Sequence, residues 1–387
     1  MSRMKSVSAL AFMATLALAG AALSDAQVQT EQPPVVPGAK PVTVEHIKIH
    51  GTSLEGNLEG EAVDRDVIVF LPPSYAKDKH RRYPVVYALH GFFIGAEQWT
   101  HEIRVPQTIE GAFAKGAQEM IVVLPDSKTI YGGSMYSSSE TTGDFENFIA
   151  HDVVSNIDAH YRTIPDRNSR GLVGHSMGGY GASRIGMKHP DVFGALYIMS
   201  PCCMSPMTGD GPGPADQMKD RAIANEQKVV AAKSPADLAA QSPGFVTAQF
   251  ATAAAWAPDP KNPPLYFDLT TKDGVPLPEI VAKMTANAPL AFIDQYIDNL
   301  RKYRAISIDV GDQDGLRFDT IKLHNILDSY GIAHGFEIFS GTHTSAVAYR
   351  FQDHVLPFFS KNLCETGGKP GDKNRENRGT DGTFPRN

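Results

Sequence analysis

The sequence is poor in cysteine and in charge. It holds 3 cysteines in 387 residues, and only 20% of its residues are charged. Three cysteines are too few for a disulfide framework, and a hydrophobic content of 42% excludes a disordered or fibrous chain. Basic residues are outnumbered, since 36 Lys and Arg against 43 Asp and Glu leave a net charge of -7. Such a chain has no basic excess to neutralise phosphates, so we expect no nucleic-acid partner.

Motifs for metal binding are also missing. The chain has no HExxH pattern, and no group of Cys and His has the spacing of zinc ligands. We therefore expect no metal site.

An apolar run opens the chain. Arg3 and Lys5 precede an apolar stretch from about Ala9 to Leu23, and small residues follow up to Ala26. The stretch is too short to span a bilayer comfortably, and its small residues offer a cleavage site. We expect residues 1–26 to be a signal peptide and the mature chain to be periplasmic or extracellular, without stable membrane insertion. An uncleaved membrane anchor is the alternative.

Strand-like runs alternate with helical patterns between two polar ends. Residues 27–42 predict an extended leader, and residues 365–387 hold almost nothing apolar, which predicts a disordered tail. The alternation over residues 43–364 is typical of a mostly parallel sheet covered by helices on both faces. The expected strands are 44–50, 65–71, 84–89, 119–124, 170–174, 194–199, 304–310 and 335–339. The expected helices lie near 105–115, 145–160, 177–188, 316–329 and 344–361.

Two departures from this alternation are informative. The first two strands have no helix between them, so we expect an antiparallel hairpin at one edge of the sheet. Residues 204–300 have a Gly/Pro-rich start, Ala-rich helical pieces and a Pro-rich middle. We interpret this segment as a cap-like insertion between the sixth and seventh strands.

A serine between two glycines is the strongest candidate for chemistry. In Gly174-His175-Ser176-Met177-Gly178, a short apolar strand precedes Ser176 and a helix-forming segment follows it. This is the setting of a nucleophile elbow, whose tight turn leaves no room for side chains two positions before and after the serine. We predict Ser176 as a nucleophile.

Such a serine needs a histidine to take its proton and an acid to orient that histidine. Behind an elbow of this kind, the acid and then the histidine follow in the chain. The seventh strand ends in a turn that contains Asp312 and Asp314; we prefer Asp314 as the acid, with Asp312 as the alternative. His343, in the loop after the last strand, is the predicted base. We interpret His324, His334 and His354 as surface or packing residues and His175 as a core residue that points away from Ser176.

Two N–H donors are needed for the oxyanion that forms on the ester carbonyl. The N–H of Met177 is one by its position next to Ser176. The N–H of Phe92 is the second candidate, in the loop that follows the third strand. The alternative is that His90-Gly91 only makes a turn there.

At these residues the chain resembles the bacterial putative esterase family, which includes esterase D, S-formylglutathione hydrolases, feruloyl esterases and mycolyltransferases. The resemblance implies an α/β-hydrolase fold, a triad of Ser176, Asp314 and His343, and cofactor-free hydrolysis of a carboxylic ester. It covers roughly residues 45–360 apart from the insertion, which has no equal in the short members. The matching pieces are Leu89-His90-Gly91, Tyr131–Tyr136, Gly143-Asp144, Tyr161-Arg162-Thr163, Gly174–Gly181, Lys188–Gly194, Gly311–Asp314 and Gly341–His343.

The expected partner is a small-molecule ester of an aryl or short-chain acid. Phe92 and Phe93 stand where many relatives have further glycines, and Phe93 is a candidate for lining the pocket. Through the resemblance Tyr131, Ser134 and Tyr136 are further pocket candidates, with a surface loop as the alternative. An acyltransferase with the same triad and an inactive binding protein on the same fold are the competing functions. The sequence carries no signal for an oligomeric state.

The three cysteines do not form an obvious pair. Cys202 and Cys203 follow the sixth strand at the catalytic edge, whereas Cys364 follows a helix that leads roughly 25 Å away from that edge. A disulfide needs Cα atoms within about 7 Å, so we expect Cys364 to pair with neither. A strained bridge between Cys202 and Cys203 stays open.

Overall fold

The computed structural model describes residues 28–205, 215–242 and 244–365. The expected signal peptide, residues 206–214 of the expected insertion, and residues 366–387 of the expected tail lie outside the described residues.

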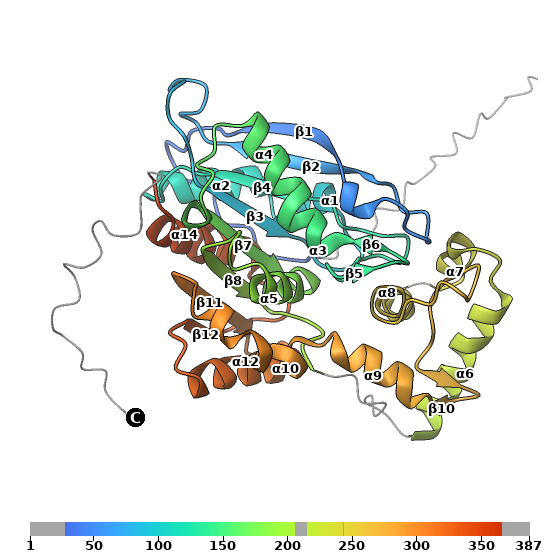
Figure 1. The fold of residues 1–387 in the computed structure, drawn as a ribbon. Coiled ribbons are helices and arrows are strands. Elements are labelled where there is room, and N and C mark those ends of the chain that lie inside the picture. Colours follow the sequence, from blue (N-terminus) through green and yellow to red (C-terminus); the bar gives the residue numbers. More distant parts are fainter. Residues whose placement is uncertain (1–27, 206–214, 243, 366–387) are drawn as a thin grey trace, which may run out of the picture.

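An eight-stranded sheet forms the centre of the structure (Figure 1). The first two strands in spatial order run antiparallel to their neighbours, and the remaining neighbours are parallel. In spatial order the strands are β1 (Thr43–His50), β2 (Asp64–Leu71), β4 (Ile121–Pro125), β3 (Val85–Leu89), β7 (Arg170–His175), β8 (Ala195–Met199), β11 (Ala305–Gly311) and β12 (Gly335–Phe339).

The sheet confirms the predicted fold class. Each strand begins and ends within two residues of its expected range, and β1 and β2 form the expected antiparallel hairpin at one edge. The strands β3, β4 and β8 are buried along their whole length, as expected for parallel strands covered on both faces. Short elements outside the sheet are η1 (Thr52–Leu54), β5 (Ser138–Ser139), β6 (Gly143–Asp144) and η3 (Arg167–Ser169).

Helices cover both faces because side chains alternate along each strand. In β3, Val85, Tyr87 and Leu89 face one apolar cluster, whereas Val86 and Ala88 face the other. The first cluster is covered by α3 (Phe145–Asn147), η2 (Phe148–Val153), α4 (Val154–His160), α5 (Met177–Lys188) and α12 (Arg317–Ser329). The second is covered by α1 (Ala96–Glu102), α2 (Val105–Ala114), α13 (Val347–Arg350), η5 (Phe351–Val355) and α14 (Leu356–Asn362).

The helix predictions differ from the structure in two respects. The helix α1 was not predicted. In addition, the expected helices at 145–160 and 344–361 each contain a π-helical segment, η2 and η5. The apolar spacing of a sequence does not show a single wide turn inside a helix, because the same face stays buried on both sides of it.

The N-terminal segment runs along the helices of the second face. Val28 is buried, and its N–H donates to the Glu102 carboxylate at 2.8 Å. The N–H of Glu31 donates to the carbonyl of Ser345 at 2.9 Å, and Ala348 N–H donates to the Thr30 hydroxyl at 3.2 Å. The expected leader is thus packed on the domain and contacts the segment that follows His343.

The segment between β8 and β11 projects beside the sheet (Figure 1). It has an apolar cluster of its own, which includes Leu238, Phe250, Leu265 and Phe267, and Tyr131 of the sheet domain packs in that cluster. Its elements are α6 (Ala215–Ala231), α7 (Pro235–Ala240), α8 (Phe245–Trp256), β9 (Thr271–Lys272), β10 (Val275–Pro276), α9 (Pro278–Ala286), α10 (Pro289–Phe292), η4 (Ile293–Tyr296) and α11 (Ile297–Leu300). The insertion therefore joins the sheet domain partly through an aromatic side chain.

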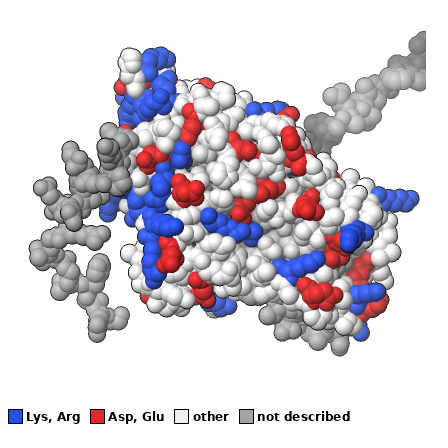
Figure 2. All heavy atoms as spheres, in the orientation of Figure 1, with Lys and Arg blue, Asp and Glu red and all other residues white. Residues whose placement is uncertain are grey.

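The surface carries both signs of charge. Figure 2 shows Lys and Arg gathered at the upper left, over the loop that precedes β3, and mixed charges elsewhere on the visible face. Within the described residues, no helix combines the length and the apolar character that crossing a membrane would require.

Candidate active site

Ser176 occupies a sharp turn between β7 and α5. Its backbone has φ 60° and ψ −116°, a strained conformation for a residue with a side chain. A Cβ atom on Gly174 would lie 2.0 Å from the Gly178 carbonyl oxygen, and one on Gly178 would lie 2.0 Å from that of Leu89. Only glycine fits at both positions, which is the reason for the Gly-x-Ser-x-Gly spacing.

Main-chain hydrogen bonds hold this turn against the end of β8. Ser176 N–H donates to the Met199 carbonyl at 3.1 Å, and Cys202 N–H donates to the Ser176 carbonyl at 3.1 Å. The Ser176 residue is half-buried. The strain at Ser176 is therefore maintained by backbone contacts on both sides.

Asp314 and His343 form a direct pair. The Nδ1 atom of His343 lies 2.7 Å from Oδ2 of Asp314, and Asp314 is only 2% exposed. Burial alone would raise the pKa of Asp314, but its hydrogen bonds with His343, the Leu316 N–H and Ser200 hold that pKa below its usual value. Asp314 is thus a buried carboxylate that stays ionised and fixes the orientation of the His343 ring.

The alternative acid, Asp312, has a different environment. It is exposed, and its carboxylate accepts a hydrogen bond from the Gly341 N–H at 2.9 Å. Its own N–H donates to the Phe339 carbonyl at 2.8 Å. Asp312 therefore joins the two loops that carry Asp314 and His343, and it does not contact the imidazole.

His343 lies at the same edge of the sheet as Ser176. Its ring centroid is 4.7 Å from that of His175, the residue that precedes Ser176. The Nε2 atom of His175 lies 2.8 Å from the carbonyl oxygen of His343, and His175 is buried. Burial and the nearby His343 lower the pKa of His175 to about 3, so this ring is neutral and donates from Nε2.

Sequence reasoning assigned His175 to the core and missed this contact. His175 is buried as expected, but it also supports the main chain of the loop that carries His343. The only signal in the sequence is its position as the last residue of β7, next to Ser176.

The two predicted oxyanion donors lie on segments that meet at the elbow. A Cβ atom on Gly133 would contact Met177 Sδ at 2.4 Å and the Phe92 ring at 2.7 Å, so both side chains pack at one point. A Cβ on Gly91 would lie 3.4 Å from Cβ of Ser176. Within the described residues the N–H of Phe92 makes no hydrogen bond, whereas that of Phe93 donates to the Gly132 carbonyl at 2.8 Å. The Phe92 N–H is therefore available for a ligand.

The four pocket candidates differ in exposure. Phe93 is half-buried and lies beside Phe92, with ring centroids 5.6 Å apart. Tyr131, Ser134 and Tyr136 are fully buried and contact protein. The Tyr136 hydroxyl donates to the His90 carbonyl at 3.0 Å, and so supports the loop of Phe92. Direct substrate contact by these three residues stays a prediction.

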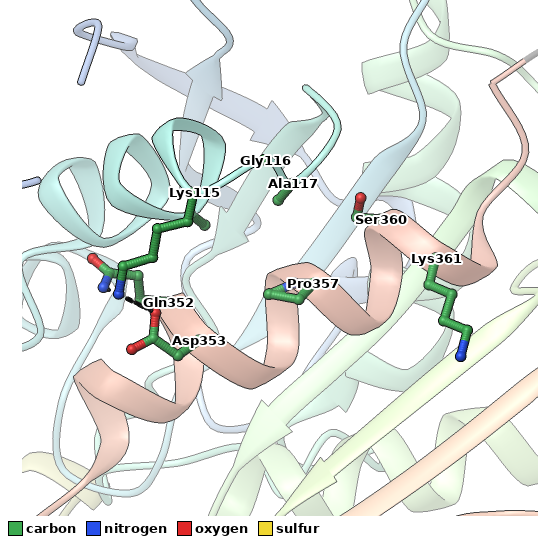
Figure 3. A pocket seen from close by; sticks show the side chains of 9 residues that line it. Lys115, Gly116, Ala117, Gln352, Asp353, Pro357, Ser360 and Lys361 are labelled. Carbon is green, nitrogen blue, oxygen red and sulfur yellow. Dashed lines mark hydrogen bonds and ion pairs between the residues drawn. The ribbon is translucent and has the colours of Figure 1, made fainter. Parts of the chain in front are cut away.

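Two surface hollows lie away from this site. One, of about 300 Å³, is formed by the end of α2 and by η5 and α14, and Lys115 pairs with Asp353 beside it at 2.7 Å (Figure 3). The second includes Arg82 and Pro84, just before β3. Both therefore lie toward the amino ends of the parallel strands, whereas Ser176 follows the carboxyl end of β7.

The cysteines are all free thiols. The Sγ atoms of Cys202 and Cys203 lie 2.8 Å apart beside the elbow. The N–H of Cys364 donates to the Asn168 carbonyl, which precedes β7. Cys364 thus lies at the opposite end of β7 from Cys202. This confirms the prediction that Cys364 pairs with neither Cys202 nor Cys203.

Comparison with known proteins adds to this geometry. Residues 62–353 match the family described as Putative esterase. An endo-1,4-beta-xylanase/feruloyl esterase of Xylanibacter ruminicola is 29% identical over 138 residues, which cover 34% of this chain and 19% of that protein. The chain thus matches about a fifth of the length of this curated relative.

Solved structures share the fold. A ferulic acid esterase superposes with a TM-score of 0.58 at 22% identity, covering 84% of this chain and 99% of the other. An S-formylglutathione hydrolase of Staphylococcus aureus superposes with a TM-score of 0.52 at 14% identity, covering 83% and 99%. Because the family match covers most of the chain and the sheet has the expected order, this protein belongs to the putative esterase family and has the α/β-hydrolase fold.

Proposed function

We propose that the chain is an exported carboxylic ester hydrolase that acts through an acyl-enzyme on Ser176. The observation that carries the proposal is the contact of buried Asp314 with half-buried His343, 2.7 Å apart, at the edge where Ser176 occupies its strained turn. A strained serine and an oriented imidazole at one edge of the sheet are what nucleophilic acyl transfer needs. Membership of the esterase family supports the ester as the substrate class.

The first half-reaction begins at the serine hydroxyl. The Nδ1 of His343 is hydrogen-bonded to Asp314, so Nε2 is the ring nitrogen that takes the proton from Ser176. The serine oxygen attacks the ester carbonyl, and the negative charge that develops is held by the N–H groups of Phe92 and Met177. When the tetrahedral intermediate collapses, the alcohol leaves with the proton from His343 and the acyl group stays on Ser176.

Water completes the second half-reaction. His343 takes a proton from the attacking water, and the same two N–H groups hold the second oxyanion. Release of the carboxylic acid returns the proton to Ser176. Every proton in this cycle moves through one imidazole, so its orientation by Asp314 matters in both halves.

An aromatic acyl group fits the surroundings best. Phe92 is half-buried and packs against both the sheet-domain cluster and the cluster of the insertion. Phe93 lies beside it and is half-buried as well. Two partly exposed rings next to the nucleophile favour a flat apolar acyl group. The similarity to an endo-1,4-beta-xylanase/feruloyl esterase supports a hydroxycinnamate as the acyl group.

Export is part of the proposal because of the N-terminal pattern. Arg3 and Lys5, the apolar run and the small residues up to Ala26 are typical of a signal peptide. Expression of the full chain in a bacterial host, with N-terminal sequencing of the periplasmic protein, tests this part. A new N-terminus near residue 27 supports export, whereas an intact Met1 in the cytoplasm contradicts it.

A series of esters tests the activity and its preference. Purified protein is assayed on acetyl, butyryl, octanoyl and feruloyl esters of one alcohol, and we expect the highest kcat/KM on the feruloyl ester. A fluorophosphonate probe followed by peptide mass analysis is expected to label Ser176. Absence of labelling together with no turnover would instead favour an inactive binding protein. Transfer of the acyl group to an added sugar or alcohol in preference to water would favour an acyltransferase.

A further inference from the structure

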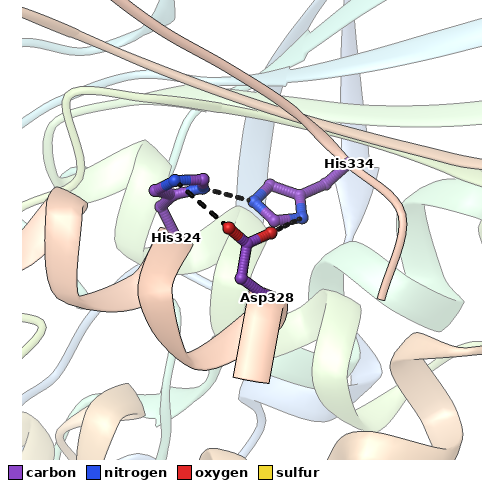
Figure 4. Close-up of side chains that lie close together, drawn as sticks. All are labelled: His324, Asp328 and His334. Atoms are coloured by element: carbon purple, nitrogen blue, oxygen red, sulfur yellow. Dashed lines mark hydrogen bonds and ion pairs between the residues drawn. The ribbon is translucent and has the colours of Figure 1, made fainter. Parts of the chain in front are cut away.

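Two histidines and an aspartate meet at the far end of α12 (Figure 4). His324 and Asp328 lie one helical turn apart on α12, and His334 lies in the segment that leads into β12. One ligand atom from each of the three lies within 4.8 Å of the others. Within residues 28–205, 215–242 and 244–365, this is the one such group of His, Cys, Asp and Glu side chains. It stands apart from Ser176, Asp314 and His343.

The buried member, His334, is already oriented for binding. Its side chain is 2% exposed, and its Nδ1 lies 2.8 Å from the carbonyl oxygen of Ile332. Because a carbonyl only accepts, Nδ1 carries the proton and Nε2 carries the lone pair. Histidines that bind metals are commonly held this way, with the second ring nitrogen donating to a backbone carbonyl.

The lone pair of His334 faces the second imidazole. Its Nε2 lies 2.8 Å from Nδ1 of His324. The ring of His324 stacks on Phe336, with centroids 4.1 Å apart and planes inclined by 11°. This stacking fixes the plane of the second ring, so both imidazoles are held by contacts outside the group.

Asp328 supplies the third donor at the open side. Its carboxylate lies 3.5 Å from His324 Nε2 and 4.0 Å from His334 Nδ1, the ring nitrogens that do not take part in the 2.8 Å contact, and its side chain is 61% exposed and so free to turn. Among the described residues no Lys or Arg forms an ion pair with this carboxylate. Among the described residues the group therefore joins two imidazoles and an anionic oxygen with no Lys or Arg in an ion pair to it.

We propose that His324, Asp328 and His334 form a binding site for a divalent transition-metal ion, with Zn²⁺ as the best match. Two imidazoles and one carboxylate suit zinc better than magnesium or calcium, which prefer oxygen ligands. Water completes the coordination at the side where Asp328 is exposed.

Binding needs a small separation of the two rings and a rotation of the Asp328 side chain. Tetrahedral zinc holds two nitrogen ligands about 3.3 Å apart, so the two rings separate by about 0.5 Å from their present contact. The exposed carboxylate rotates toward the ion.

The position of the site suggests its role. The connection made by α12 and β12 leads from the Asp314 loop to the His343 loop, and the site joins the end of α12 to the start of β12. With 13 residues in α12, the ion lies roughly 20 Å from Asp314. A bound ion therefore stabilises the segment between the two residues without entering the reaction.

Calorimetric titration of the EDTA-treated full chain with ZnCl₂ tests the proposal. We expect one zinc per chain, and a rise in Tm of roughly 4 °C when free zinc is 100 times Kd. MgCl₂ is expected to cause no such rise. The variants Asp328→Asn and His324→Gln are expected to bind zinc at least tenfold more weakly, and neither changes a fully buried side chain.

His50→Gln is the matched control. His50 also contacts two carboxylates, Asp64 at 2.7 Å and Glu55 at 2.8 Å, but through opposite ring nitrogens. This variant is expected to bind zinc as the parent does. Absence of stoichiometric binding, or equal binding by parent, Asp328→Asn and His324→Gln, overturns the proposal. Ester hydrolysis plays no part in this test, so failure of the proposed function leaves its outcome unaffected.

Discussion

At the carboxyl edge of the sheet, main-chain atoms hold the candidate site together, whereas side chains make most contacts between the insertion and the sheet domain. The turn at Ser176 is bonded to the main chain of Met199 and Cys202. Likewise, Gln313 N–H donates to the Gly341 carbonyl at 2.9 Å and joins the loops of Asp314 and His343.

The insertion is attached through rings and polar side chains. The ring of Tyr131 packs on Phe250 and Phe267, with centroids 6.2 and 6.0 Å away. The indole N–H of Trp256 donates to the Ser137 hydroxyl at 3.0 Å, and Arg184 donates to the Asn287 side chain at 3.0 Å. A region held this way can change in sequence while the backbone of the catalytic edge stays the same. We infer that the edge supports the chemistry and that the insertion is where selectivity varies.

The largest expected effect comes from removing the predicted nucleophile at the catalytic edge. Ser176→Ala is expected to lower kcat on a p-nitrophenyl ester by about 10⁵- to 10⁶-fold, because the nucleophile is lost while the oxyanion donors remain. Ser183→Ala is the control: among the described residues the one hydrogen bond of this buried hydroxyl is to the Gly179 carbonyl within α5. The control is expected to keep activity within about threefold, since it removes one local hydrogen bond. Comparable rates for Ser176→Ala and parent would disprove the nucleophile.

The next-largest effect distinguishes the roles of Asp314 and Asp312, two carboxylates of the same turn. Asp314→Asn is expected to lower kcat by about 10³- to 10⁴-fold, because an amide cannot stabilise the imidazolium in the same way. Asp312→Asn keeps a side-chain oxygen for the Gly341 N–H and is expected to change kcat by less than about threefold. A larger loss of kcat in Asp312→Asn than in Asp314→Asn would show that Asp312 is the acid.

A third change tests whether the insertion is held by its rings. Tyr131→Ala is expected to destabilise the contact between the two regions by about 3–5 kcal/mol, as for other large buried aromatic side chains. Tyr131→Phe is expected to be neutral or slightly stabilising, because the buried hydroxyl has no hydrogen-bond partner among the described residues.

The two tryptophans report different places. Trp99 lies in the second cluster of the sheet domain, whereas Trp256 of the insertion packs on Tyr180 in the first cluster and so reports the contact between the two regions. Urea unfolding of Tyr131→Ala in a Trp99→Phe background is expected to show the Trp256 signal changing at lower urea than in the Trp99→Phe parent. In a Trp256→Phe background the Trp99 transition is expected to move less. Equal shifts of both signals would show that the two regions unfold as one unit.

The smallest effect concerns a buried acid, Glu146, that joins α3 to the end of α5 within the sheet domain. Burial alone would raise the pKa of Glu146, but His189, Arg184 and Lys188 lower it to about 2, from an ordinary value of 4.5. Because the folded pKa is depressed, its stabilisation is fully present above about pH 4.5 and is lost as the pH falls toward 2.

We therefore expect the free energy of unfolding to fall by about 2–3 kcal/mol over that window through this residue. Glu146→Gln is expected to be less stable than the parent at pH 7, with the difference shrinking toward pH 2. Urea denaturation at several pH values measures this difference. A difference that is the same at pH 7 and pH 2 would contradict the assignment.

Local patterns predicted much of this protein from the sequence. Buried strands show as short apolar runs, so the eight strand ranges were within two residues of the structure. The Ser176 turn was predictable because the Gly-x-Ser-x-Gly spacing lies within one strand–turn–helix segment, although the contact that requires Gly178 is with Leu89 of β3. The elements of the insertion were less well defined, because its composition shows a break in the pattern without defining the packing.

Only the tertiary structure decided which distant residues meet. Asp312 and Asp314 are equivalent in sequence terms, and their difference depends on a contact across 29 residues that places Asp314 on His343. The burial of Tyr131, Ser134 and Tyr136, and the meeting of His324, Asp328 and His334, depend likewise on how loops close over helices. The sequence by itself determined the local backbone, since neighbouring residues set its allowed dihedral angles and its buried faces. Contacts between distant side chains arise only when the whole sheet positions their loops.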